Sequence, residues 1–191
     1  MGKLQKKLVE DLISRSHNEK WEIGNRIVRA LGGDPTPQVT GLPARRGHGD
    51  GGIDGRIPIL IRQRVVIEKL KRKSDGMELP ERIKEGKFEW VETEAGFNIK
   101  IEKDCFKRDT INAFVENLKR EGIFAGIIVT ATGLCPDAQS EFHRHNDKAM
   151  DLCHISLENL LGGDISCADI RFVTSDLAAK LRVSLREYLT S

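Results

Sequence analysis

The sequence predicts an α/β domain in which helices flank a mixed central sheet. Apolar patterns typical of helices and of strands alternate in the order helix, strands, helix, strand, helix, strand, helix, and this order is typical of α/β domains. Residues 124–130 form a continuous apolar run of strand length, which indicates a strand buried on both faces. With 191 residues, 39% of them hydrophobic, the chain has the size of one domain, residues 1–191, with its own core.

Helices are expected where apolar residues recur every three or four positions. The first covers the N-terminus. The second begins at a capping box formed by Ser16 and Glu19 and carries Trp21 inward. Asp109 is expected to cap a third helix, and Gly122 to end it. Further helices are expected at residues 136–143, 156–161 and 177–189.

Strands are expected at residues 57–68, 88–92, 97–103, 124–130, 150–155 and 170–174, with a shorter one at 38–40. The polar segment 69–89 carries a turn signal at Ser74-Asp75-Gly76. Glu94-Ala95-Gly96 is expected to join two strands as a hairpin. We therefore expect a β-hairpin region, about residues 62–95, inserted into the domain.

Composition disfavours several classes of protein. Lysine and arginine number 31 against 29 acidic residues, so the net charge of +2 does not by itself indicate a polyanionic partner. No apolar run approaches the roughly 20 residues that span a bilayer, so we expect no membrane segment and a cytoplasmic protein. The four cysteines form no CxxC pair, which disfavours a zinc finger and favours free intracellular thiols.

The densest chemical signal is the glycine-rich segment 41–55. It holds two acids, Asp50 and Asp54, and three possible cations upstream of them, Arg45, Arg46 and His48. Glycine lets the backbone approach a ligand closely, and Mg²⁺ prefers hard oxygen ligands. The pattern indicates either a metal site or a solvated turn that closes a hairpin.

A second signal is the strand that ends near residue 103. Side chains two residues apart on a strand share a face. Ile99, Ile101 and Lys103 are therefore expected on one face, and Lys100 and Glu102 on the other. Lys103 would end an inward row, where its ammonium group could stabilise a phosphate. An exposed edge strand is the alternative.

Five segments in order carry a resemblance to a known family. They are Trp21-Glu22, Gly49-Asp50-Gly51-Gly52-Ile53-Asp54, the strand ending in Lys103, Gly126-Ile127-Ile128-Val129-Thr130, and residues 152–161. Together they resemble the Mrr-type restriction endonuclease family, within the PD-(D/E)xK nuclease superfamily. The resemblance covers residues 21–161.

This resemblance implies a restriction-endonuclease-like fold that hydrolyses phosphodiester bonds of double-stranded DNA with Mg²⁺, or with Mn²⁺ in its place. Asp54 matches the metal-binding acid, and Glu22 matches the helix acid that would help to hold the metal. Lys103 matches the lysine of the motif.

One position departs from the family's pattern. The family normally places Glu or Gln two residues before the lysine, where this chain has Ile101. Glu102 could supply the missing carboxylate only if a bulge or a shifted register turned Lys100 and Glu102 inward. Aligning the motif on Glu68-Lys69 instead agrees less well with the segments that follow, so we prefer Lys103.

The expected insertion contains the one strongly basic stretch of the sequence. Against the single acid Glu68 it carries Arg62, Arg64, Lys69, Lys71, Arg72 and Lys73. We expect these side chains, together with Arg45 and Arg46, to contact DNA phosphates. A solvated hairpin is the alternative.

The leading interpretation is a Mg²⁺-dependent DNA endonuclease acting as a restriction enzyme. A Holliday-junction resolvase and a catalytically silent DNA-binding module on the same fold are the alternatives. A homodimer would provide the two active sites that cutting both strands requires. The final helix could pair with its twin in such a dimer, or could simply cover the sheet.

Overall fold

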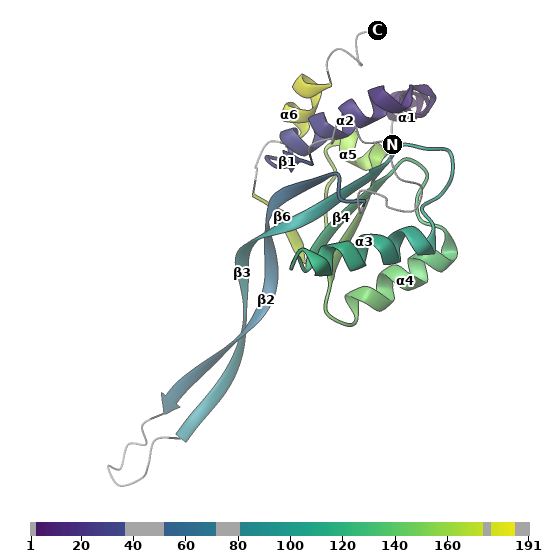
Figure 1. Cartoon of the computed structure of the whole chain (residues 1–191). Helices are drawn as coiled ribbons and strands as arrows, with labels where there is room; N and C mark the ends of the chain where they lie inside the picture. The colour runs from purple at the N-terminus through teal and green to yellow at the C-terminus, as the bar shows by residue number, and fades with distance from the viewer. Residues whose placement is uncertain (1–2, 37–51, 72–80, 174–176, 186–191) are drawn as a thin grey trace.

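Six helices and six strands make up the described part of the computed structural model, which covers residues 3–36, 52–71, 81–173 and 177–185 (Figure 1). The helices are α1 (Lys3–Ser14), α2 (His17–Ala30), α3 (Arg108–Arg120), α4 (Pro136–Asn146), α5 (Leu157–Gly162) and α6 (Leu177–Ser184). The strands are β1 (Asp34–Pro35), β2 (Gly55–Lys71), β3 (Glu81–Lys100), β4 (Ala125–Thr130), β5 (Asp151–Ser156) and β6 (Ile170–Phe172). The expected α/β class is confirmed.

All six strands belong to one mixed sheet, as the sequence predicts. Its order is β1-β2-β3-β4-β5, and β6 also pairs with β2. The pairs β3–β4 and β4–β5 are parallel, whereas β2 is antiparallel to β1, β3 and β6. The parallel half needs crossover connections, and α3 and α4 supply them.

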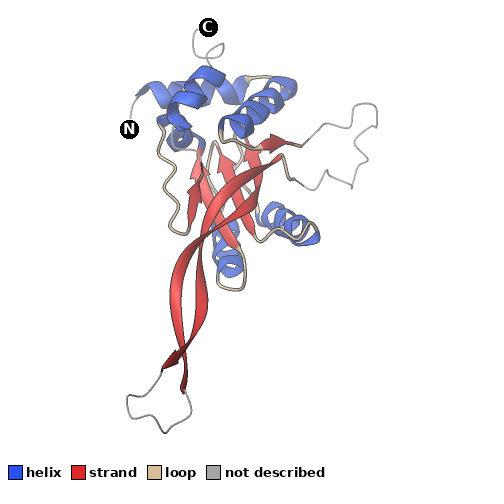
Figure 2. Cartoon of the chain, turned by 90° about the vertical axis from the view of Figure 1, so that its left-hand side faces the viewer, coloured by secondary structure: helices blue, strands red, loops and turns tan. Residues whose placement is uncertain are grey.

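Helices cover both faces of the sheet, and each face has its own apolar core (Figures 1 and 2). Residues of α1, α2, α5 and α6 pack on one face, and residues of α3 and α4 on the other. All six residues of β4 are buried, and their side chains alternate between the two cores. The prediction of a doubly buried strand at this position is confirmed.

The expected start of α2 is also confirmed. Ser16 is its N-cap, its hydroxyl accepts a hydrogen bond from the Glu19 backbone N–H, and the Glu19 carboxylate accepts one from the Ser16 backbone N–H. The hydrogen bonds from Ser16 hold the pKa of the Glu19 carboxyl below its ordinary value. The capping box fixes where α2 begins. Asp109, in contrast, lies in the first turn of α3, whose N-cap is Lys107, so the expected cap was wrong.

The hairpin expected at residues 94–96 does not exist. β3 runs without interruption through this segment, and Ala95 and Gly96 pair with both β2 and β4. Both residues are buried, and a Cβ on Gly96 would collide with Leu118 of α3. The small residues are there because a helix packs closely on the strand, and not because the chain turns. The expected turn at residues 74–76 and the strand at 38–40 lie outside the described residues.

β2 and β3 continue far beyond the rest of the sheet. β4 pairs with β3 only from Ala95 onward, and β6 pairs with β2 only up to Ile61. Residues 62–71 and 81–90, which we call the arm, therefore form a twisted two-stranded ribbon that projects from the core (Figures 1 and 2). The arm lies in the region where the hairpin insertion is expected.

The cysteines form two disulfides, so the expectation of free thiols was wrong. Cys105, after β3, is bonded to Cys135 at the start of α4, and Cys153 of β5 is bonded to Cys167. The Cα–Cα distances are 5.3 and 6.0 Å. In each pair the partners are distant in sequence, and the fold brings them together. No helix in the described part of the chain is both long enough and apolar enough to cross a bilayer.

Close packing of α3 on the sheet predicts the effect of adding one methyl group. A Cβ on Gly126 would lie 2.8–2.9 Å from side-chain atoms of Leu118, Leu152 and Phe114. Gly126→Ala should therefore lower the free energy of unfolding by about 1–3 kcal/mol, measured by chemical denaturation, because overpacking strains a filled core. Gly162→Ala is the matched control, since its nearest atom would lie 3.9 Å away, and it should change stability by less than about 0.5 kcal/mol. Equal effects of the two substitutions would contradict this account of the packing.

Candidate functional site

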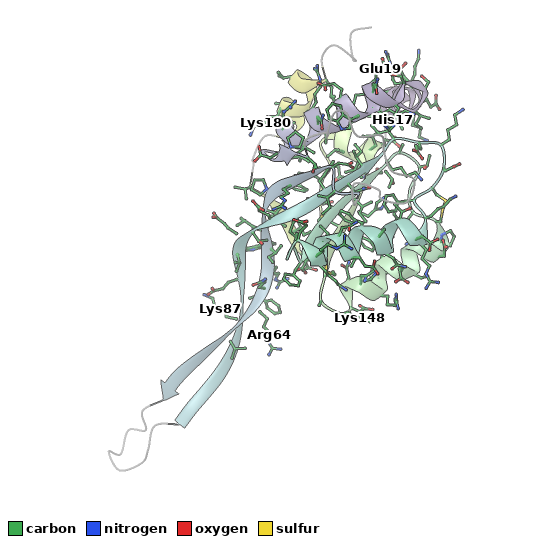
Figure 3. All side chains as sticks on the ribbon, viewed as in Figure 1. His17, Glu19, Arg64, Lys87, Lys148 and Lys180 are labelled. Atoms are coloured by element: carbon green, nitrogen blue, oxygen red, sulfur yellow. A yellow bond between two sulfur atoms is a disulfide. The ribbon has the colours of Figure 1, made fainter. Side chains whose placement is uncertain are left out.

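A pocket opens where the carboxyl end of β3 and the residue before β2 meet the first half of α2. Its lining consists of His17, Lys20, Trp21, Gly24, Asn25, Asp54, Ile99, Lys100, Ile101 and Glu102. The α2 members recur every three or four residues, as expected for one side of a helix. The capping box at Ser16 starts the helix immediately before His17, which Figure 3 labels at the start of α2.

Asp54 is held in the pocket by hydrogen bonds to its backbone and to its side chain. Its N–H donates to the Phe97 carbonyl at 2.7 Å, and its own carbonyl accepts from the Thr36 N–H at 2.8 Å. Its Oδ2 accepts from the Ile99 N–H at 2.7 Å. Because the carboxylate bonds to the backbone of β3, its position relative to the end of that strand is fixed.

Asn98 lies opposite Asp54 in the strand register, since the next residues along, Gly55 and Phe97, are directly paired. The Asn98 side chain is buried, and its Nδ2 donates to the Gly52 carbonyl. Gly52 has a φ of +65°, a left-handed conformation that glycine adopts readily. With the amide nitrogen bonded to this turn, the oxygen Oδ1 is the atom of Asn98 that can accept a donor or bind a cation.

Lys100 is the last residue of β3 and lies two positions after Asn98, in the same side-chain row. Its side chain is 20% exposed, and its Nζ lies 3.3 Å from the Glu102 carboxylate, which is 58% exposed. An acid, an amide and a lysine, Asp54, Asn98 and Lys100, thus come together at the end of one strand pair.

Lys103 does not lie where the sequence predicts. β3 ends at Lys100, Ile101 is buried, and residues 102–104 bend away from the strand direction. Lys103 is exposed and is not part of the pocket lining. Ile99 and Ile101 line the pocket, and so do Lys100 and Glu102, but Lys103 lies beyond the end of β3, so its expected place at the end of the inward row was wrong.

Glu22 also lies outside the pocket lining. It forms an ion pair with Arg26, one helical turn away, at 3.3 Å, and its side chain is 38% exposed. Successive helix residues are rotated by about 100°, so Glu22 does not share the direction of its neighbour Trp21. Trp21 was expected to be a core residue, but it is 36% exposed and lines the pocket.

Four residues of the pocket lining escaped the sequence analysis: His17, Lys20, Gly24 and Asn25. Asn25 is a buried amide on an otherwise apolar helix face, which is a local signal for a polar site. Asn98-Ile99-Lys100 repeats the spacing of a polar residue two positions before a lysine. Lys100 therefore has a polar residue two positions before it, whereas Lys103 has Ile101 at that position.

Those residues expected to contact nucleic acid that the structure describes lie on the arm, away from the pocket. Arg62 and Arg64 are exposed on the arm. Lys69 and Lys71 occupy positions on β2 farther along the arm. Arg45, Arg46, Arg72 and Lys73 lie outside the described residues. Among the described residues, no group of three or more His, Cys, Asp and Glu side chains is placed to hold a metal ion.

Comparison with protein-family models and with curated protein sequences finds no match for this chain. A function for the protein therefore has to be inferred from the residues of the pocket and of the arm.

Proposed function

We propose that the protein is a metal-dependent DNA endonuclease of restriction-endonuclease-like fold, with its active site in the pocket between α2 and the end of β3. The observation that carries this proposal is that Asp54, Lys100 and Glu102 line one pocket, while the buried Asn98 lies beside it, opposite Asp54 in the strand register and two residues before Lys100. If Lys100 is the lysine of the motif, the residue two positions earlier is Asn98, whose side chain is an amide. The resembled family accepts Glu or Gln there, and Asn carries the same amide group as Gln.

The oxygen atoms of the pocket suit Mg²⁺ or Mn²⁺. Mg²⁺ in phosphate chemistry is commonly bound by only one or two carboxylates, with water and substrate oxygens completing the octahedron. Asp54 would supply a carboxylate and Asn98 its amide oxygen, and Glu102 offers a second carboxylate at the rim. Such an ion, when bound, would act as a Lewis acid that lowers the pKa of a bound water and neutralises charge on the phosphate.

Lys100 would act on the transition state of phosphodiester hydrolysis. A fixed ammonium group is most valuable where negative charge develops during the reaction, in a site that is partly shielded from water. The Lys100 side chain is largely buried and is oriented by Glu102. A substrate phosphate would compete with Glu102 for its ammonium group. Lys20 and His17, which line the pocket on its α2 side, would contact flanking phosphates.

One observation favours a catalytically silent DNA-binding module as the second candidate. The buried position opposite Asp54 holds an amide where an acid would bind a metal more strongly. Nicking of supercoiled plasmid in Mg²⁺ distinguishes the candidates, because a silent module binds the plasmid and leaves it intact. A Holliday-junction resolvase receives less support, since the helix acid Glu22 pairs with Arg26 and does not line the pocket. If the protein cleaved four-way DNA junctions in preference to linear duplex DNA, the resolvase would become the better supported candidate.

The two lysines near the end of β3 provide a matched pair of substitutions. Lys100→Ala should lower the rate of Mg²⁺-dependent plasmid nicking by about a hundredfold, the effect typical of losing one charge-stabilising group. Lys103→Ala removes the same charge from an exposed position and should change the rate less than about twofold. A large loss with Lys103→Ala and none with Lys100→Ala would contradict this assignment. Melting temperatures of both variants serve as the control for folding.

Asp54 can be tested without removing its hydrogen bond to β3. In Asp54→Asn the amide oxygen can still accept from the Ile99 N–H, but the negative charge is lost, so nicking should fall below detection while the protein remains folded. Glu22→Gln is the matched control because it removes a carboxylate outside the pocket. It should cut at the wild-type rate and lose about 0.3–0.5 kcal/mol of stability. Wild-type cleavage by Asp54→Asn would remove the endonuclease assignment from this pocket.

A further inference from the structure

The arm has two different faces, which the strand register defines. Arg62 lies opposite Trp90, Arg64 opposite Phe88, and Val66 opposite Gly86. Directly opposed residues of an antiparallel pair project to the same side, so these residues share one face. With Arg171 of β6, they form what we call the arginine–aromatic face. The other face carries Gln63, Lys87 and Glu89 at alternate positions.

On the arginine–aromatic face the guanidinium groups lie over the ribbon. The Cζ of Arg62 is 4.5 Å from the centre of the Phe88 ring, and that of Arg171 is 4.0 Å from the centre of the Trp90 ring. Arg64 covers the backbone of Gly86, where a Cβ would lie 2.9 Å from its Nη2. Within the described part of the chain no ion pair joins these three arginines to a carboxylate. Stacking holds the charges in place without neutralising them.

The charges of the arm are segregated between its two faces. Lys87 pairs with Glu89 at 3.4 Å on the opposite face, and Figure 3 shows the side chains of Arg64 and Lys87 leaving the ribbon on different sides. Arg62 and Arg64 thus lie on one face with no carboxylate partner among the described residues, whereas the cation and the acid on the other face pair with each other.

The arginine–aromatic face is also apolar and uncovered. Phe88 and Val66 are each 57% exposed, and neither belongs to an apolar core. This face combines guanidinium groups that no described carboxylate neutralises with an exposed aromatic ring. Its partner is therefore expected to carry many negative charges and to offer flat apolar groups for contact. Duplex DNA has that chemistry, and its major groove admits a two-stranded β-ribbon.

We propose that the arginine–aromatic face of the arm binds the DNA duplex by entering its major groove, with Arg62, Arg64 and Arg171 directed to phosphates. This inference rests on the proposed function for its choice of DNA as partner. Of the basic stretch expected to contact DNA it includes Arg62 and Arg64, and it adds Arg171 of β6. Ten residues of β3 separate Trp90 from Lys100, roughly 33 Å along an extended strand. The arm therefore contributes to binding and takes no part in the chemistry.

The test compares the loss of positive charge from each face. Binding of a 30-base-pair duplex, about three helical turns, is measured in EDTA over a range of salt concentrations for the whole chain. Arg62→Ala with Arg64→Ala should reduce the slope of log K against log salt by about two, since each lost phosphate contact removes about 0.9. Lys87→Ala, the control on the opposite face, should leave the slope unchanged. Phe88→Ala should weaken binding without changing the slope.

An unchanged slope in the double arginine variant, or equal losses from both faces, would overturn the proposal. So would a wild-type chain that does not bind duplex DNA, an outcome that would assign the face to a protein partner. If the alanine variant fails to fold, Arg62→Gln with Arg64→Gln keeps the side-chain stems and removes only the charges.

Plasmid nicking separates this inference from the proposed function. If wild-type protein nicks plasmid and the arginine variant binds normally, the arm proposal fails and the endonuclease stands. If binding depends on the arginines but no nicking occurs, the arm proposal stands and the endonuclease fails.

Discussion

One strand register, with Gly55 opposite Phe97 and Lys71 opposite Glu81, determines the positions of both the pocket and the arm. At one end of the strand pair it places the Asp54 carboxylate within hydrogen-bonding distance of the Ile99 N–H. At the other end it divides the charged residues of the arm between two faces. Because side chains alternate along a strand, a slip of one residue would transfer every side chain to the opposite face.

The core prevents such a slip. Ile57, Ile59 and Ile61 of β2 and Phe97 of β3 are buried against the helices of one face, and Gly96 lies beneath Leu118 on the other. A shifted register would place arginine and glutamate side chains in this core and expose the isoleucines, at a cost of several kcal/mol in buried charge alone. The register is thus held by apolar packing in the middle of the strands. The same register fixes the positions of the polar side chains at the ends of the two strands.

The chain after β3 determines which lysine reaches the pocket. Phe106 pairs with Leu134, and the disulfide between Cys105 and Cys135 lies beside that bridge, so the chain is tied to the start of α4 soon after the strand ends. The Thr132 hydroxyl also donates to a carbonyl in the bend at 2.9 Å. These contacts turn the backbone after Lys100, which leaves Glu102 at the rim of the pocket and Lys103 in solvent.

Local pattern in the sequence was sufficient for the α/β class, the start of α2 at Ser16 and the buried strand β4, because each depends on residues that are neighbours along the chain. It also indicated Asp54, since a glycine-rich acid before a strand is a local feature. The choice of Lys100 over Lys103, the exclusion of Glu22 from the pocket, the cysteine pairing and the true length of β3 depend on contacts between distant segments. Ala95-Gly96 illustrates the reason: small residues suit a turn and a close helix contact equally well, and only the packing of α3 decides between them.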